Sequence, residues 1–405
     1  MPISRLARDV GESPTLKLNQ RAGELRASGA AVIHLGAGEP KSKVPMEAIL
    51  AASGLLGSGE IRYTATDGTP GMKKAIIKYM ADNYRVEVGP KNVIVSAGAK
   101  QALYTLLLAI VDPGDEVVFP APYWVSYPEM IRLCGGIPRP VSASDGGFVP
   151  SLADVESALG PKTRAVILNS PNNPSGAVYS DTLVSGVVEL CERLGLYCVL
   201  DDIYHRLVFD GRDPPNACRF AKQPFPASRL VVINGVSKLY AMTGFRIGWT
   251  VTNPEVQAAM DRIQAQTTSC PSALLQEAAA AAIQGDQGCV DTLRLTLQNH
   301  RDVMCRELAG IRGVRVQTPA GTFYCLPDFR AYSGDSDALS RMLLDKAQVV
   351  TVPGREFGME GFLRLSFCGS LKDAVDGVAR IRWALDPESP REIFIGDRRC
   401  VRDWT

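Results

Sequence analysis

The sequence is poor in histidine and has no paired cysteines, and both features argue against a metal centre. Only three histidines are present, His34, His205 and His300, and they lie far apart. The ten cysteines are scattered singly, and none forms a C-x-x-C pair, so zinc or iron–sulfur ligation is not expected. Scattered single cysteines are typical of reduced thiols in the cytosol. We therefore predict a cytoplasmic protein without a metal site.

An excess of one charge and a long apolar run are also missing. The chain has 44 basic and 43 acidic residues, whereas a nucleic-acid-binding protein would show a basic excess. No uninterrupted apolar stretch reaches the roughly 18 residues of a membrane span. The N-terminal residues MPISRLARDVGESPT lack the apolar core of a secretion signal. We expect no nucleic-acid or membrane partner, and instead a small ligand bound at a local site.

What the sequence does contain is an alternation of apolar runs with helical patterns. With 405 residues, 46% of them hydrophobic, the chain can form more than one structural unit. The predicted strands are 93–98, 116–120, 164–169, 197–201, 229–234 and 246–252, and the predicted helices among them are 99–111 and 183–195. Continuous Val/Ile/Leu runs indicate strands buried on both faces. The pattern predicts an α/β fold with a mostly parallel sheet between helices.

The pattern changes after about residue 253. Helices are predicted over 273–283 and 293–311, and the stretches 321–329 and 361–369 alternate enough for a half-solvated antiparallel sheet. The predicted units are an N-terminal segment, 1–45, that joins the small domain, a large domain, 46–285, a small α+β domain, 286–385, and a C-terminal tail, 386–405. The tail is polar and contains two prolines, so we expect it to be loosely held.

The most informative stretch is "NGVSKLYAMTGFRIGW", in which Lys238 follows an apolar strand and Arg246 lies eight residues later. Lysine is a useful nucleophile when its amine is neutral, or when it is tied up as a Schiff base. The usual partner in such chemistry is pyridoxal phosphate, PLP. Its phosphate needs backbone amides and cations, its pyridine nitrogen needs a carboxylate, and its ring needs an apolar or aromatic face.

The sequence "VSAGAKQAL" could meet the phosphate demand. It reads as a strand, small residues and a helix, so the amides of Gly98, Ala99 and Lys100 would lie at a helix N-terminus. Arg246 would add a bidentate donor, and Ser237 a hydroxyl. Strand–glycine–helix joints are common in α/β proteins, so this motif is weak evidence when taken alone.

The other two demands also have candidates. In "VLDDIY", Asp201 ends an apolar strand, where ligands bind in open α/β sheets, and Tyr204 could donate to the phenolic oxygen. Asp201 could equally cap a helix or turn. In "PAPYWVSYPEM", Trp124 or Tyr123 could stack on a flat ring or belong to the core. Asn173, in "NSPNNPSG", follows another strand, although ordinary turn chemistry also explains that sequence.

Taken together and in this order, the motifs resemble the class I/II aminotransferases, the PLP-dependent enzymes of fold type I. The likeness is strongest to the prokaryotic aspartate aminotransferases and the aspartate/prephenate aminotransferases. It runs from about Ser13 to about Leu385. It is carried by "GAGEP", "IRYTATDGTP", "SAGAKQAL", "PAPYWVSYPEM", "NSPNNPSG", "DDIY", "SKLYAMTGFRIGW" and "FLRLSF".

The resemblance implies roles for particular residues around the cofactor. Lys238 would hold PLP as a Schiff base and move a proton, and Asp201 would pair with the pyridinium nitrogen. Tyr204 and Asn173 would bond the phenolic oxygen. The residues around the phosphate would be Gly98, Ala99, Lys100, Ser237 and Arg246, with Trp124 stacked on the ring.

It also implies how the substrate is bound and how subunits pair. Arg364 would hold the substrate α-carboxylate, helped by Asn173 and the Gly38 backbone, and Trp124 would line the same site. Tyr63 would reach the phosphate of the neighbouring subunit, so the active unit would be a homodimer with shared sites.

The implied activity is a ping-pong transamination between an L-amino acid, with aspartate or another acidic or aromatic one favoured, and a 2-oxo acid such as 2-oxoglutarate. A β-lyase or an oxidative enzyme on the same fold is the first alternative, because fold does not settle reaction type. A non-enzymatic PLP-binding module would need an effector domain, for which the chain leaves no room. A nucleotide oxidoreductase, suggested by "HLGAGEP", is disfavoured because Lys41 replaces the third glycine and Pro40 blocks the helix.

The sequence departs from the family where the substrate enters. The family's usual GEPDFDTP is "GEPKSKVP" here, which places Lys41 and Lys43 where acidic residues are usual. Phe245 replaces the usual tryptophan before the phosphate arginine, and "DDIY" replaces DEIY. Lys100 is a candidate for binding an acidic substrate side chain, because similar bacterial enzymes use a lysine in that position. Lys17, Lys41 and Lys43 remain rivals for this role.

Overall fold

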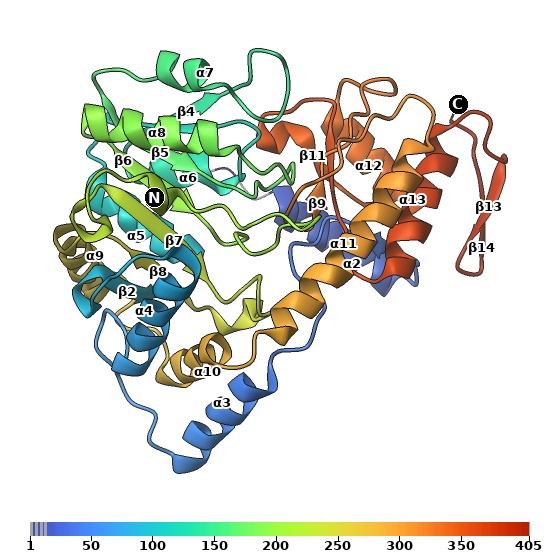
Figure 1. Ribbon diagram of the computed structural model, residues 1–405. Coiled ribbons are helices and arrows are strands. Elements are labelled where there is room, and N and C mark those ends of the chain that lie inside the picture. Colours follow the sequence, from blue (N-terminus) through green and yellow to red (C-terminus); the bar gives the residue numbers. More distant parts are fainter. Residues whose placement is uncertain (1–2, 5–6, 9–10, 12–13, 405) are drawn as a thin grey trace.

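The computed structural model describes residues 3–4, 7–8, 11 and 14–404. Its larger part is built around a seven-stranded sheet with the strand order β2-β8-β7-β6-β5-β3-β4 (Figure 1). The strands are β2 (Val93–Ser96), β3 (Glu116–Pro120), β4 (Ile137–Val141), β5 (Thr163–Leu168), β6 (Tyr197–Asp201), β7 (Leu230–Gly235) and β8 (Gly248–Val251). Only β8 runs antiparallel to its neighbours. The predicted α/β class with a mostly parallel sheet is confirmed.

Helices cover both faces of this sheet. One face carries α5 (Ala99–Ile110), α6 (Ser126–Leu133) and α9 (Pro254–Thr267). The other carries α4 (Pro70–Tyr84) and α8 (Asp181–Leu194), with α7 (Leu152–Ser157) packed on α8 and α10 (Ala273–Gln284) packed on α4. Along β2, β3, β5, β6 and β7, alternate residues enter the two separate apolar cores. This double burial explains why the strand sequences are continuously apolar.

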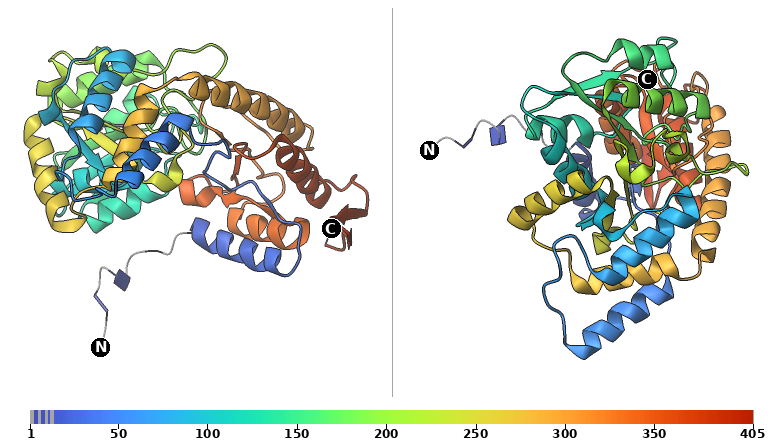
Figure 2. Two further views of the ribbon diagram at one scale, coloured as in Figure 1. Left: turned by 90° about the horizontal axis from the view of Figure 1, so that it is seen from below. Right: turned by 60° about the vertical axis from the view of Figure 1, so that its left-hand side comes forward.

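The remaining elements form a smaller group beside the sheet (Figures 1 and 2). Its helices are α2 (Pro14–Ala27), α11 (Gly288–Ala309), α12 (Ser336–Ala347) and α13 (Leu371–Leu385). Its short strands are β1 (Ile33–His34), β9 (Tyr324–Cys325), β10 (Val349–Val350), β11 (Val352–Pro353) and β12 (Leu363–Ser366). β1 pairs with β10 in parallel, which attaches the N-terminal segment to this group.

The sheet predicted for 321–329 and 361–369 exists as β9 and β12 and is antiparallel. The expectation that one of its faces is solvated is wrong, because every residue of both strands is buried. The two polar positions of β12 face protein instead of water. Arg364 donates to the backbone oxygen of Gly36, and the Ser366 amide donates to that of Leu35.

The C-terminal tail is also more ordered than we expected. It forms a hairpin of β13 (Glu392–Ile395) and β14 (Arg398–Val401), followed by the buried Arg402. The Arg402 guanidinium donates to the backbone oxygens of Trp383, Pro387 and Ser389, at the C-terminal end of α13. Trp404 packs against the Trp383 ring with centroids 5.4 Å apart. The polar tail is therefore fixed because Arg402 donates hydrogen bonds to backbone oxygens at the end of α13.

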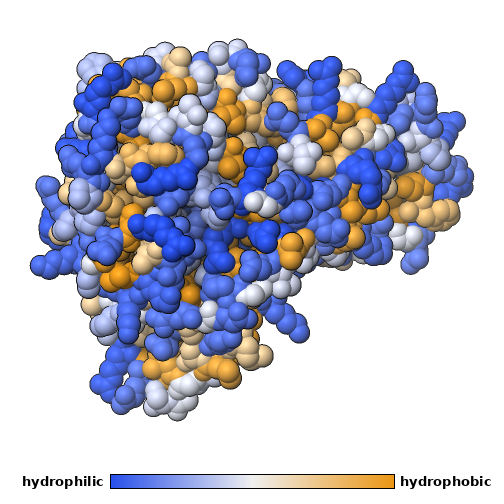
Figure 3. Space-filling model, viewed as in Figure 1, coloured by the Kyte–Doolittle hydropathy of each residue, from blue (hydrophilic) through white to orange (hydrophobic). Residues whose placement is uncertain are grey.

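Helix α3 (Met46–Ser58) projects from the larger part and packs on α10 (Figures 1 and 2). Apolar residues gather on the surface at this tip (Figure 3).

None of the helices in the described residues is long and apolar enough to cross a membrane. All ten cysteines are free.

Candidate active site

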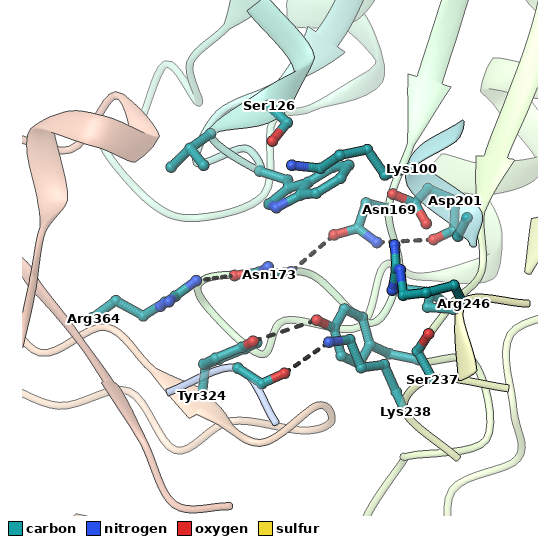
Figure 4. A pocket seen from close by; sticks show the side chains of 16 residues that line it. Lys100, Ser126, Asn169, Asn173, Asp201, Ser237, Lys238, Arg246, Tyr324 and Arg364 are labelled. Atoms are coloured by element: carbon teal, nitrogen blue, oxygen red, sulfur yellow. Dashed lines mark hydrogen bonds between the residues drawn. The ribbon is translucent and has the colours of Figure 1, made fainter. Parts of the chain in front are cut away.

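A cavity of about 420 Å³ lies where the carboxyl ends of the parallel strands meet the smaller group of elements. All the predicted site residues line it except Gly98 and Tyr63. It is also lined by five residues to which the sequence assigned no role, Val125, Ser126, Asn169, Ile203 and Tyr324. Figure 4 shows that its polar side chains converge from strands, loops and a helix N-terminus.

Lys238 follows β7 and points into this cavity (Figure 4). Its Nζ donates to the carbonyl oxygen of Gly38 at 2.7 Å. Burial lowers the pKa of the Lys238 amine to about 8, and the positive charges of Arg364 and Arg246 act in the same direction. Near pH 8 about half of this amine is neutral and can act as a nucleophile.

Asp201 ends β6 and is buried beneath the cavity. The Tyr127 hydroxyl donates to its Oδ2 at 2.5 Å, and the Asn169 amide donates to its backbone oxygen at 2.8 Å. Burial raises the pKa of the Asp201 carboxyl to about 6, while Tyr127, the Ile203 amide and the Lys238 charge oppose that rise. The group is therefore ionised near neutral pH and can hold a proton on a ring nitrogen.

Tyr127 is a site residue that the sequence reasoning missed. It lies inside the quoted "PAPYWVSYPEM" motif, three residues after Trp124, and the two rings meet edge to face at 5.5 Å. The Tyr127 amide donates to the Trp124 oxygen at 3.0 Å, so the two residues share the turn that leads into α6, and their three-residue spacing was the available signal.

The N-terminus of α5 forms an anion site at one end of the cavity. Gly98 stands at its N-cap position without any side-chain cap, so the first amides of the helix are not bonded by a capping side chain. A Cβ on Gly98 would lie 2.7 Å from Arg246 Nη2, and a Cβ on Gly248 would collide with the backbone nitrogen of Ala99. Both positions need glycine so that the arginine and the helix start can meet. The Gly98 amide, which was predicted for this site, is not free, because it donates to the Ser96 oxygen at 2.7 Å. The amides of Ala99 and Lys100, a guanidinium and the nearby Ser237 hydroxyl fit a phosphate group.

Arg364 is fixed at the other side of the cavity (Figure 4). Its Nη1 donates to Asn173 Oδ1 at 3.0 Å, and its Nη2 donates to the Gly36 oxygen at 3.1 Å. The guanidinium lies 4.3 Å above the centre of the Tyr324 ring. Among the described residues no acidic group pairs with it, and its Nε has no hydrogen-bond partner. A positioned and unneutralised guanidinium is a binding site for a carboxylate.

Tyr324 contacts three residues that were predicted for the site, namely Arg364, Tyr204 and Gly38. Its hydroxyl lies 3.4 Å from that of Tyr204, and a Cβ on Gly38 would meet it at 2.7 Å. Gly38 must therefore be glycine for the N-terminal segment to pass this close. The contacts with Tyr204 and Gly38 join residues that are 120 or more positions apart, so no local sequence pattern could indicate them.

Lys100 is the lysine that the structure brings into the cavity beside Lys238. Its Nζ lies 5.0 Å from the centre of the Trp124 ring, and burial together with the Arg246 charge lowers its pKa. Lys41 instead pairs with Asp373 at 3.1 Å, and Lys43 borders a separate small hollow. The side chain of Lys17 lies outside the described residues.

The charges in the cavity are strongly unbalanced. It is lined by four cationic side chains, Lys100, Lys238, Arg246 and Arg364, but by only one carboxylate, that of Asp201. In the part of the chain that the structure describes, none of the four takes part in an ion pair within 4.0 Å. A cavity of this kind binds anions. No group of three or more metal-ligating side chains occurs among the described residues.

Known proteins are similar to this chain in sequence and in fold. The family model of class I and II aminotransferases matches residues 30–381. The probable aspartate/prephenate aminotransferase of Aquifex aeolicus is 37% identical, over 92% of this chain and 96% of its own. The aspartate aminotransferase of Geobacillus stearothermophilus is 36% identical, over 94% and 98%.

Solved structures agree with the sequence comparison. The aspartate aminotransferase of Thermus thermophilus, solved with maleate, superimposes with a TM-score of 0.89 at 34% identity, covering 94% of this chain and 99% of that one. Family match, identity and fold extend over nearly the whole chain, and the cavity has the lysine, carboxylate and anion site that PLP needs. The chain therefore belongs to the class I and II aminotransferases and is a PLP-dependent transaminase.

Proposed function

We propose that this transaminase takes L-aspartate as amino donor and a 2-oxo acid such as 2-oxoglutarate as acceptor. The observation that carries the proposal is the set of four cations without ion-pair partners that faces a single carboxylate in the cavity. A cofactor phosphate, a substrate α-carboxylate and a distal carboxylate supply three anionic groups. A monocarboxylic substrate would leave the Lys100 charge without an anionic partner in a cavity that favours anions.

Within this proposal each polar residue has a defined task. Lys238 holds the cofactor through its amine and moves the proton at the substrate α-carbon. Asp201 would hold the proton of the ring nitrogen, and Tyr204 and Asn173 would bond the phenolic oxygen. PLP, when bound, supplies an electron-poor ring that stabilises negative charge on that carbon.

The substrate lies between two cationic side chains. Arg364 takes the α-carboxylate, because Asn173 and the Gly36 oxygen already fix its guanidinium. Lys100 takes the distal carboxylate, because it is the remaining cation of the cavity once Arg246 serves the phosphate and Lys238 the chemistry. The names of the relatives and the maleate bound to the Thermus enzyme support a dicarboxylic substrate.

The active unit that we propose is a homodimer with shared sites. Tyr63 does not line the cavity of its own chain, and its side chain is 92% exposed. It follows α3, whose outer face is apolar, so a second copy can cover both and receive Tyr63 at its phosphate site.

The proposed organisation keeps the predicted boundaries, with 1–45 and 286–385 around the smaller group of elements, 46–285 around the seven-stranded sheet, and 386–405 as the tail. We place the enzyme in the cytoplasm, which the ten free cysteines support.

The decisive experiment compares substrates in a Lys100→Ser variant. We expect kcat/KM for aspartate to fall by about tenfold to a hundredfold, the value of one hydrogen bond to a charged group. Activity with phenylalanine should change little, and the affinity for PLP should stay the same. Lys43→Ser serves as the control, because Lys43 lies outside the cavity.

A different result would mean that Lys100 has another role in the cavity. If all substrates suffer alike and PLP dissociates more readily, Lys100 serves the phosphate. The wild-type enzyme should be screened with 2-oxoglutarate, oxaloacetate and prephenate as acceptors. A β-lyase or an oxidative enzyme would release product from the amino acid without any oxo-acid acceptor.

A further inference from the structure

Tyr63 lies where an exposed stretch of chain meets a rigidly held one. Residues 59–62 and Tyr63 are exposed. The next residues, which we call the 64–69 segment, pack against β2. Gly68 is buried there with φ of 111°, and a Cβ on it would collide with the Val95 side chain. Tyr63 therefore directly precedes a segment whose backbone is fixed.

Gln264 of α9 holds the middle of the 64–69 segment. Its side chain is fully buried. Its amide nitrogen donates to the backbone oxygens of Thr66 at 2.7 Å and Val95 at 2.8 Å, and its Oε1 accepts from Ser96 Oγ at 2.7 Å. Both donors and the acceptor are used, so only a glutamine amide of this reach satisfies the three groups.

Gln276 of α10 holds the two ends of the same segment. Its Oε1 accepts from the Thr69 amide at 2.7 Å, and its Nε2 donates to Thr64 Oγ1 at 3.2 Å. It is fully buried as well. Two buried glutamines from separate helices thus fix the 64–69 segment at its start, its middle and its end.

Gln264 also contacts the strand that leads to the anion site of its own chain. Ser96, which donates to it, precedes Gly98 by two residues. The backbone amide of Val95 donates to the Asp67 oxygen at 3.0 Å, which joins the strand and the 64–69 segment directly. One buried amide therefore bonds both the segment next to Tyr63 and the approach to the phosphate-binding helix.

We propose that Gln264 is a positioning residue whose main action is across the dimer, because it fixes Tyr63 for the phosphate site of the second copy. The inference rests on the shared-site homodimer proposed above. It means that cofactor retention in one subunit depends on Gln264 of the other.

Hybrid dimers test this directly. One chain carries Lys238→Ala and the other keeps Lys238, with different affinity tags for purifying the mixed species. Only the site with Lys238 can bind PLP in a form that borohydride fixes covalently. The readout is the rate at which borohydride-fixable PLP is lost during dialysis of the holoenzyme, which needs no turnover.

Gln264→Met keeps the size of the side chain and removes its hydrogen bonds. Placed in the Lys238→Ala chain, it should speed PLP loss from the opposite site by about tenfold, as expected when one hydrogen bond to a phosphate is weakened. Placed in the chain with Lys238, where it can reach the anion site only through Ser96 of the same chain, it should change the rate by a clearly smaller factor. Gln276→Met should give the same asymmetry if Gln264→Met prevents folding.

Controls separate this inference from the proposed dimer. Gln287→Met removes another glutamine that makes several hydrogen bonds, away from the 64–69 segment, and should change neither rate. Tyr63→Phe should act only from the Lys238→Ala chain. If Tyr63→Phe acts across the dimer but Gln264→Met acts only within its own chain, equally from both or not at all, the positioning role is wrong and the dimer stands. If Tyr63→Phe acts only within its own chain, the shared site is wrong and the inference falls with it.

Discussion

At the scale of single residues, burial changes the chemistry of Lys238. The unfolded chain has the ordinary lysine pKa of 10.5, and the folded site has about 8. The folded state therefore binds this proton less well, and the resulting loss of stability is present below pH 8 and disappears as the pH rises from 8 to 10.5. The same shift makes the amine reactive in the neutral range.

This shift predicts how the apoenzyme takes up PLP. The rate of covalent attachment should rise by about tenfold per pH unit below 8 and level off above it, since the neutral amine is the nucleophile. Borohydride fixation after short mixing times measures the rate, and Lys238→Ala gives the background. A rate that keeps rising to pH 10 would show that Lys238 behaves as an ordinary surface lysine.

Tyr127 predicts a shift in the pH profile. Removing its hydrogen bond in Tyr127→Phe should raise the pKa of Asp201 above about 6, so the acidic limb of kcat/KM moves to higher pH. A bond to a charged group worth about 1.5–3 kcal/mol corresponds to roughly one to two pH units. Activity should be lost mainly at pH 6–7 and recover in alkaline solution.

The chain offers a matched control for this variant. Tyr84 is another buried tyrosine, and its hydroxyl donates at 2.9 Å to Asp202, the next residue after Asp201 but not one that lines the cavity. Tyr84→Phe should affect stability to a similar degree and leave the pH profile in place. Equal shifts in both variants would mean that Tyr127 acts only on the fold.

At the scale of helices and strands, the sequence predicted the elements whose pattern is purely local. β6 and β7 are continuous apolar runs, and α5 begins after a glycine and matches its predicted start. β4, with the sequence IPRPV, was missed because two prolines argue against a strand. It lies at the sheet edge, where proline is tolerated.

The site residues also differ in whether a local sequence pattern indicates them. Lys238 and Asp201 are recognisable because each stands at the end of an apolar strand inside a distinctive motif. Tyr324 was missed, since its role depends on meeting Gly38 and Tyr204 from distant parts of the chain. The C-terminal hairpin was missed because a polar composition says nothing about which backbone oxygens an arginine will bind.

The hairpin predicts a stability effect without a catalytic one. Arg402→Met removes the guanidinium that binds backbone oxygens in the last turn of α13 and just after it, and should lower the free energy of unfolding by about 2–4 kcal/mol. Arg399→Met breaks only an exposed ion pair with Glu392 and should cost less than about 1 kcal/mol. Urea unfolding of the two variants measures the difference. Similar values would show that Arg402 does not anchor the tail.

At the scale of the whole molecule, one end of the larger part exposes an apolar surface. Exposed apolar side chains gather on α3 and just after it, namely Met46, Ile49, Leu50, Leu56, Ile61 and Tyr63. The opposite side of α3 is occupied by α10, so this outer face has no partner within the described chain. Clustered apolar residues of this kind mark an interaction surface, and Tyr63, which we propose completes the site of the second copy, stands at its border.

Leu50→Glu combined with Leu56→Glu should therefore separate the subunits. Each leucine loses about 1.5–3 kcal/mol of burial, so the dimer dissociation constant should rise by at least about a hundredfold. Sedimentation at several protein concentrations measures this, and Leu295→Glu, at an equally exposed leucine on α11, should leave the association unchanged. The separated subunits should also lose PLP faster, because no Tyr63 reaches their phosphate site. A double variant that stays dimeric would move the interface away from α3, whereas a monomer that keeps its PLP would show that each chain completes its own site.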